Sequence, residues 1–134
     1  MLPPDGEFLF GRVVDTEAKI GPLLHCILIY VYRVRSRTTD IIPPLKREEL
    51  LCAPMMTNRL PWSKGYFETV AHRALATDAR LSKHCFRDSR GLYFDEFGNQ
   101  LPQAIEPVGQ WGLNSFRTID DEVSKALGLV LSPE

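Results

Sequence analysis

Cysteine and histidine residues are the first candidates for chemistry in this 134-residue chain. They include two adjacent pairs, His25-Cys26 and His84-Cys85. Neighbours on a strand point to opposite faces, so neither pair can bind one metal ion from regular β structure. The Cys-x-x-Cys and His-x-x-x-His spacings of metal sites are also missing. We therefore expect no metal site. Cys85 stays open as a nucleophile, because the basic residues beside it would lower the pKa of its thiol.

Carboxylates are the second candidates, since two of them facing each other across a cleft can act as an acid and a base. Asp95-Glu96 flanks a predicted turn, and the acidic residues at 120–122 begin a predicted helix. A turn and a helix N-terminus explain both groups without catalysis. The chain also has no Gly-rich phosphate-binding loop and no Gly-x-Ser-x-Gly elbow. The sequence therefore predicts no enzyme and no cofactor.

Charge is unevenly distributed along the chain, although the net charge is only −1. Residues 33–94 hold twelve basic and six acidic residues, whereas residues 95–134 hold two basic and seven acidic ones. Within these segments, Arg33, Arg35 and Arg37 would share one face of a strand, and Asp95 and Glu96 would present the acidic charge. Complementary charge speeds protein association, so both groups are candidate partner contacts. The acidic group would suit a partner with a basic surface and the arginines one with an acidic surface, and the sequence does not choose between them.

A nucleic-acid-binding module is the alternative interpretation of the same arginines, because Tyr30 and Tyr32 could stack on bases beside them. The sequence pI of about 6.3 lies well below the value above 9 that is typical of a dedicated nucleic-acid binder. Nucleic acid is therefore the less favoured partner.

Two aromatic-glycine clusters could supply anchors for a protein partner. Trp62 precedes Gly65-Tyr66-Phe67, and Trp111 lies between two glycines. Packing in the core is the favoured role of both tryptophans, but an exposed tryptophan is a frequent hot spot of protein interfaces. Trp62 and Trp111 are therefore predicted as candidate partner-binding residues.

The elements that position these residues are mostly strands. Four segments have strand-like patterns, at residues 7–14, 23–34, 62–72 and 92–101, the last as a hairpin. Residues 46–53 suit a short helix or a strand, and a strand is favoured. Residues 23–34 are apolar on both faces, which predicts a central strand. Residues 15–22 are predicted to be a turn or hairpin loop, and Gly11 to mark a bulge or a close backbone approach.

One helix ends the chain. Thr118 is its predicted N-cap, and its buried stripe is predicted to comprise Ile119, Val123, Ala126 and Leu127. We therefore expect a single domain over residues 1–134 with an α+β fold, in which a strongly bent antiparallel sheet or small barrel has the C-terminal helix packed on it.

The cellular compartment is predicted from the cysteine pattern and from the lack of targeting and membrane segments. Three cysteines without a framework spacing favour free thiols and a reducing compartment. The N-terminus lacks the features of a signal peptide, and the apolar run at residues 23–32 is far shorter than the ~20 residues of a membrane helix. We therefore expect a cytoplasmic protein with no membrane partner.

The order of short motifs along the chain resembles that of a known family. The motifs are Asp5-Gly6, Phe10-Gly11-Arg12-Val13-Val14, the strand at 23–34, Leu50-Leu51 with Pro54, Trp62 with Gly65-Tyr66-Phe67, Phe86 with Tyr93-Phe94-Asp95 and Gly98-Asn99, Glu106-Pro107-Val108-Gly109 with Gly112-Leu113, and the helix at 119–127.

These motifs resemble the bacterial family called immunity protein 26. Its members are encoded beside polymorphic toxins and neutralise the cognate toxin. The resemblance implies inhibition of a toxin domain by stoichiometric protein–protein binding, and it implies no catalytic residues.

Overall fold

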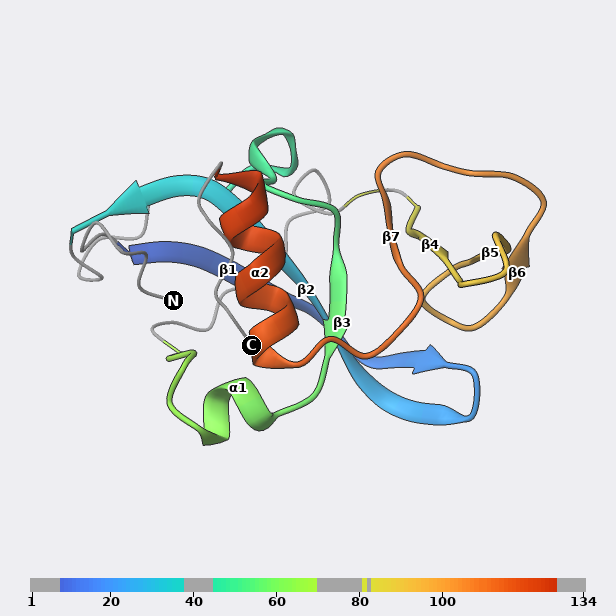
Figure 1. Cartoon of the computed structure of the whole chain (residues 1–134), viewed down its shortest axis with the longest axis horizontal. Coiled ribbons are helices and arrows are strands. Elements are labelled where there is room, and N and C mark those ends of the chain that lie inside the picture. Colours follow the sequence, from blue (N-terminus) through green and yellow to red (C-terminus); the bar gives the residue numbers. More distant parts are fainter. Residues whose placement is uncertain (1–7, 38–44, 70–80, 82, 128–134) are drawn as a thin grey trace.

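The computed structural model describes residues 8–37, 45–69, 81 and 83–127 (Figure 1). In chain order the elements are β1 (Phe8–Ile20), β2 (Leu23–Ser36), the 3-10 helix η1 (Arg47–Glu49), β3 (Met55–Thr57), α1 (Leu60–Ser63), β4 (Cys85–Arg87), β5 (Tyr93–Phe94), β6 (Gln100–Leu101), β7 (Val108–Gln110) and α2 (Phe116–Ala126).

The strands form two sheets, in the orders β1-β2-β3 and β6-β5-β4-β7. The predicted α+β class is therefore confirmed, and α2 packs on the first sheet as expected. Among the described residues the curved sheet stays open and does not close into a barrel. The pairing of β4 with β7 is parallel, whereas the other strand pairs are antiparallel.

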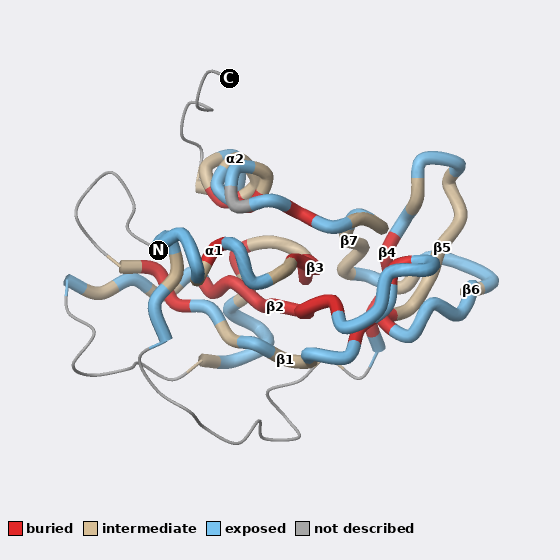
Figure 2. The backbone as a smooth tube through the Cα atoms, turned by 90° about the horizontal axis from the view of Figure 1, so that it is seen from below, coloured by how far each residue is buried: buried red, intermediate tan, exposed pale blue. Residues whose placement is uncertain are grey.

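The central position of β2 is confirmed, because it pairs with β1 on one side and with β3 on the other. Its Val, Ile and Tyr side chains suit a strand that is covered on both faces. One face joins the core formed by Leu9, Ile27, Ile29, Val31, Leu51, Met55, Ile119 and Val123. The other joins Ala18, Ile20, Cys26, Leu28, Met56 and Phe86. Figure 2 shows the middle of β2 buried and α2 lying across one side of the sheet.

β1 is longer than predicted, since it continues through the polar stretch that was expected to be a loop. The turn is confined to Gly21-Pro22. Several register shifts along the β1–β2 pair keep Ala18 and Ile20 buried while Glu17 is exposed. Gly11 meets the expected close approach, because a Cβ there would lie 3.0 Å from the carbonyl oxygen of Tyr30.

The strand predicted at 62–72 is wrong over its described residues. Trp62 lies in the helix α1, and Pro61 occupies one of the first helical positions, where its missing N–H is not needed. Residues 70–72 lie outside the described part of the chain. At residues 46–53 the structure has the short 3-10 helix η1, so the helical alternative describes this segment better than the favoured strand.

The hairpin at 92–101 and the last helix are confirmed, with one correction. β5 and β6 flank the turn at 96–99, where Gly98 has φ +87°. α2 begins earlier than predicted, because Ser115 is the N-cap and its Oγ accepts a hydrogen bond from the Thr118 amide at 3.2 Å. Ile119 and Val123 form the buried stripe, whereas Ala126 is exposed.

Candidate functional site

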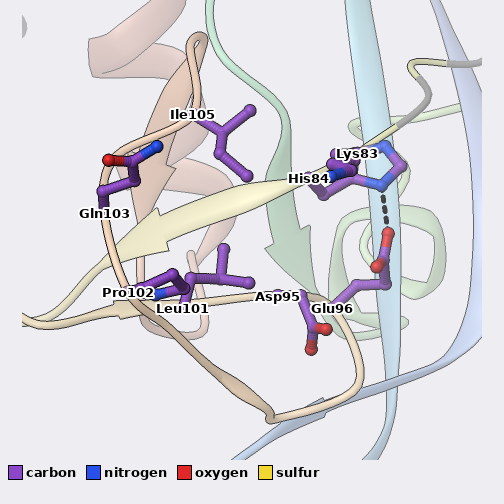
Figure 3. Close-up of a pocket in the computed structure, with 8 residues that line it drawn as sticks. All are labelled: Lys83, His84, Asp95, Glu96, Leu101, Pro102, Gln103 and Ile105. Carbon is purple, nitrogen blue, oxygen red and sulfur yellow. Dashed lines mark ion pairs between the residues drawn. The ribbon is translucent and has the colours of Figure 1, made fainter.

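Polar and titratable side chains converge at an open pocket of about 410 Å³ beside the second sheet (Figure 3). Its lining consists of Lys83, His84, Asp95, Glu96, Leu101, Pro102, Gln103 and Ile105. The β5–β6 turn and the segment before β4 bring the charged groups together, and the segment after β6 adds the apolar wall.

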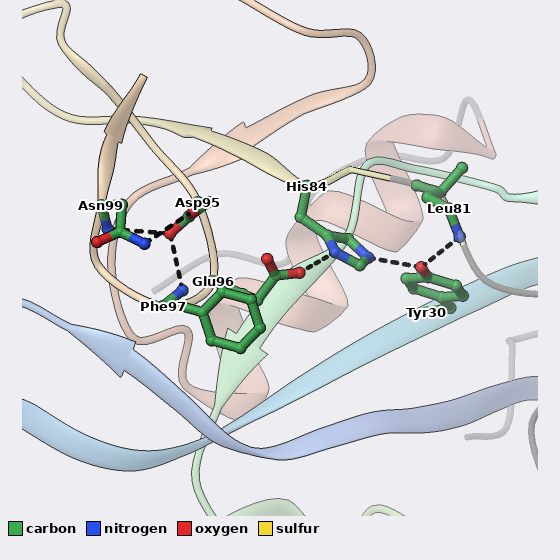
Figure 4. A network of polar contacts seen from close by, with 7 residues as sticks. All are labelled: Tyr30, Leu81, His84, Asp95, Glu96, Phe97 and Asn99. Carbon is green, nitrogen blue, oxygen red and sulfur yellow. Dashed lines mark hydrogen bonds and ion pairs between the residues drawn. The ribbon is translucent and has the colours of Figure 1, made fainter.

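Two residues of this lining, His84 and Glu96, belong to a chain of hydrogen bonds (Figure 4). The Leu81 amide donates to the Tyr30 hydroxyl oxygen at 3.0 Å, and that oxygen lies 2.6 Å from His84 Nε2. His84 Nδ1 is paired with the Glu96 carboxylate. The three residues are buried, at most 5% exposed as whole residues. One consistent assignment has Tyr30 donating to Nε2 and the Nδ1–H donating to Glu96.

This arrangement does not suit general base catalysis on a ligand in the pocket. Both ring nitrogens of His84 are occupied by Tyr30 and Glu96, so neither is available to a bound molecule. The Cys85 thiol is buried as well. The network instead joins the two sheets, because Tyr30 lies on β2 and Glu96 lies in the β5–β6 turn. A hydrogen bond of 2.9 Å from the Lys19 amide to the Glu96 carbonyl oxygen adds a second link.

The predicted acidic contacts, Asp95 and Glu96, therefore have partners inside the protein. Glu96 is buried against His84. The Asp95 carboxylate accepts hydrogen bonds from the amides of Phe97 and Asn99, each at 2.9 Å, and so holds the β5–β6 turn. The sequence placed both residues at this turn but gave no sign that Glu96 points inward.

The two tryptophans are half-buried, and each packs against a neighbouring ring that is also half-buried. Trp62 meets Phe67 edge-on, with ring centroids 5.1 Å apart, and contacts the core beneath α2. Trp111 stacks on Phe94 with centroids 4.7 Å apart and planes 18° apart. This is the packing role that the sequence favoured, and contact of either ring with a partner stays a prediction.

The three predicted arginines lie exposed at the outer end of β2. Arg33 Nε donates to the Leu50 carbonyl oxygen at 3.0 Å, which holds its guanidinium against the segment after η1. Tyr30 and Tyr32, the rings that could have stacked on bases, are fully buried on the same strand. The nucleic-acid interpretation therefore loses its aromatic surface, whereas a protein contact of Arg33, Arg35 and Arg37 stays a prediction.

The cysteines are free thiols. Burial and, to a smaller extent, the Glu122 carboxylate raise the pKa of Cys52 to about 11. In the described part of the chain, no three His, Cys, Asp or Glu side chains are grouped so that they could hold a metal ion. No helix within the described ranges has the length and apolar character needed to cross a membrane.

Comparison with known proteins gives one finding. Residues 2–92 match the family model described as Immunity protein 26, a span that runs from the N-terminal hairpin through β4. Neither the curated proteins nor the solved structures include a significant match.

Proposed function

Because the chain belongs to the immunity protein 26 family, we propose that it neutralises a cognate bacterial toxin by forming a stoichiometric complex with it. The family match carries this proposal. Enzymatic inactivation of a toxin would need a reactive group that faces the target. At the pocket, His84 and Glu96 are buried and bonded within the protein, and the neighbouring Cys85 thiol is buried as well. Binding through a complementary surface is therefore the mechanism that the geometry supports best.

Occlusion of the toxin's active face is the simplest way for such a complex to inhibit. An interface of standard size buries about 800 Å² on each partner, which is enough to cover a catalytic cleft. The internal network of Tyr30, His84 and Glu96 would then serve to hold the two sheets in one fixed arrangement. A surface that is ordered before binding loses less entropy in the complex.

The test uses the C-terminal domain of the polymorphic toxin that we expect to be encoded beside this gene. We expect co-expression of the two proteins to restore growth of cells that the toxin domain arrests. The purified proteins should form a 1:1 complex, measured by isothermal titration calorimetry. Growth arrest that persists at equal expression levels, together with no binding in the calorimeter, would contradict the proposed function.

A further inference from the structure

The end of the β1–β2 hairpin exposes two adjacent leucines. The exposed fractions are 48% for Leu23 and 59% for Leu24, and no other large hydrophobic residue in the described part of the chain is as exposed as Leu24. Figure 1 shows this end of the hairpin, in blue, extending past β3 and away from α2. Hairpin turns usually carry polar residues, so two leucines beside Gly21-Pro22 are unexpected at such a place.

A bulge turns Leu24 outward. Regular alternation would put Leu24 on the same face as Cys26 and Leu28, which are both buried. Instead, Ala18 pairs with Cys26 and Ile20 pairs with Leu23. One residue of β1 therefore lies opposite two residues of β2, the mark of a bulge.

The bulge needs an unfavourable backbone conformation. His25 has φ +57° and is, within the described residues, the one non-glycine residue with positive φ. Left-handed backbone is uncommon for residues other than glycine and is frequently found where a protein binds another molecule. In this hairpin the strained residue keeps an apolar side chain in solvent, so the conformation works against folding stability and favours an external contact.

Other contacts hold the hairpin end in place. The Glu17 carboxylate lies 2.6 Å from His25 Nδ1, across the two strands. The Lys19 amide donates to the Glu96 carbonyl oxygen at 2.9 Å, which ties the hairpin to the β5–β6 turn. Gly21 has φ +56°, as a tight turn requires. The two leucines are therefore presented on an ordered support.

We infer that Leu23 and Leu24 are the apolar anchor that enters a recess on the cognate toxin domain. This inference rests on the proposed function, which supplies the partner. Apolar anchors at the centre of an interface provide most of its affinity, and the tryptophans that the sequence suggested for this role are half-buried against neighbouring rings. Glu17, whose side chain is 70% exposed, and Asp15 outnumber Lys19 on the adjoining part of β1. The recess should therefore have basic groups at its rim.

The arginine end of β2 is the competing surface. Leu24 and Arg33 are nine residues apart on one strand, which corresponds to roughly 30 Å. That separation is about the full width of a standard interface, so a single toxin domain would be centred on one end or the other. Variants at the two ends therefore distinguish the two sites.

The experiment measures the dissociation constant of the toxin domain encoded beside this gene for Leu23→Asp and Leu24→Asp. Leu60→Asp is the matched control, because Leu60 is 49% exposed on α1 and the substitution is identical. We expect each hairpin variant to raise the dissociation constant at least tenfold and the control to change it less than twofold. The circular dichroism spectrum should stay that of the wild type, and the melting temperature should change by a similar small amount in all three variants, since the three leucines are exposed to a similar extent.

Three results would overturn the inference. Wild-type affinity in both hairpin variants, with a loss in Arg33→Glu/Arg37→Glu, would move the contact to the arginine end and leave the proposed function intact. Self-association of the wild-type protein that the hairpin variants abolish, with toxin binding unchanged, would assign the leucines to a second copy of this chain. Absence of binding by the wild-type protein would remove the proposed function and the anchor together.

Discussion

Two tyrosines on β2 allow a matched test of the buried network. Tyr30 and Tyr32 lie on the same face of the strand, are both completely buried, and have ring centroids 6.3 Å apart. The Tyr30 hydroxyl is hydrogen-bonded to Leu81 and His84. The Tyr32 hydroxyl has no hydrogen-bond partner in the described structure. Replacing each tyrosine by phenylalanine removes a fully buried hydroxyl group. Only the Tyr30 hydroxyl is hydrogen-bonded, so the two substitutions differ in the hydrogen bonds that they remove.

The two substitutions should change the free energy of unfolding by different amounts and in different directions. Tyr30→Phe leaves the Leu81 amide and His84 Nε2 without their partner, and an unsatisfied buried group costs about 1–3 kcal/mol. We therefore expect the free energy of unfolding to fall by about 2–4 kcal/mol. Tyr32→Phe removes a hydroxyl that is buried without compensation, so stability should be unchanged or rise by about 1 kcal/mol.

Urea unfolding followed by circular dichroism measures both variants. For a chain of this length, the loss in Tyr30→Phe corresponds to a drop in melting temperature of roughly 8–16 °C. The slope of the unfolding free energy against urea concentration should stay constant, which shows that the unfolded states are comparable. Equal losses in the two variants, or a larger loss in Tyr32→Phe, would refute the assignment of the network as a stabilising link between the sheets.

Three further predictions concern single positions. Gly109→Ala should lower stability by about 3 kcal/mol in urea unfolding, because its Cβ would lie 2.4 Å from the Pro54 carbonyl oxygen. Gly112→Ala, with no atom within 4 Å of its Cβ, should change stability by less than about 0.5 kcal/mol. Ser115→Ala should cost about 1 kcal/mol, measured as a lower melting temperature, and Ser115→Asp should restore it. The alkylation rate of Cys52, measured by mass spectrometry as a function of pH, should have its midpoint near the raised pKa of about 11. Because the pKa is raised in the folded state, the stability that the neutral thiol contributes should be lost as the pH rises from about 9 towards 11.

The parts of the fold that sequence predicts well are those that local chemistry determines. β2 follows from its run of β-branched and aromatic residues, and the β5–β6 turn follows from Gly98, whose positive φ a glycine accepts at little cost. The buried stripe of α2 follows from the spacing of Ile119 and Val123. In each case the pattern that predicts the element lies within a few residues of sequence.

Errors arise where polar patterning and short length remove that signal. The polar half of β1 has the composition of a loop, yet it stays in the strand because its buried members, Ala18 and Ile20, pack beside β2. α1 has only four residues, about one turn, so no apolar pattern can repeat along it. The aromatic residues around Trp62 therefore indicated a strand instead.

The candidate site depends on contacts between distant parts of the chain. His84 is buried with both ring nitrogens bonded, and its partner on β2, Tyr30, is 54 residues away in sequence. No spacing rule links two residues at that separation, because the link is made by the packing of one sheet against the other. For the same reason, the sequence placed Glu96 correctly at a turn and could not tell that its carboxylate points into the protein.

Exposure of the hairpin leucines has a related physical origin. Residue type and alternation both predict that Leu24 is buried, since alternation assigns a strand residue to a face only while the register is regular. The register shift between Ala18 and Ile20 inserts one residue opposite Lys19, and the side chain that should have joined the core points to solvent. Residues that favour interfaces by type, such as Trp62 and Trp111, also favour cores, and here both are half-buried against neighbouring rings. The proposed anchor, Leu23 and Leu24, is therefore exposed because of the bulge in the β1–β2 pair and not because of its residue type.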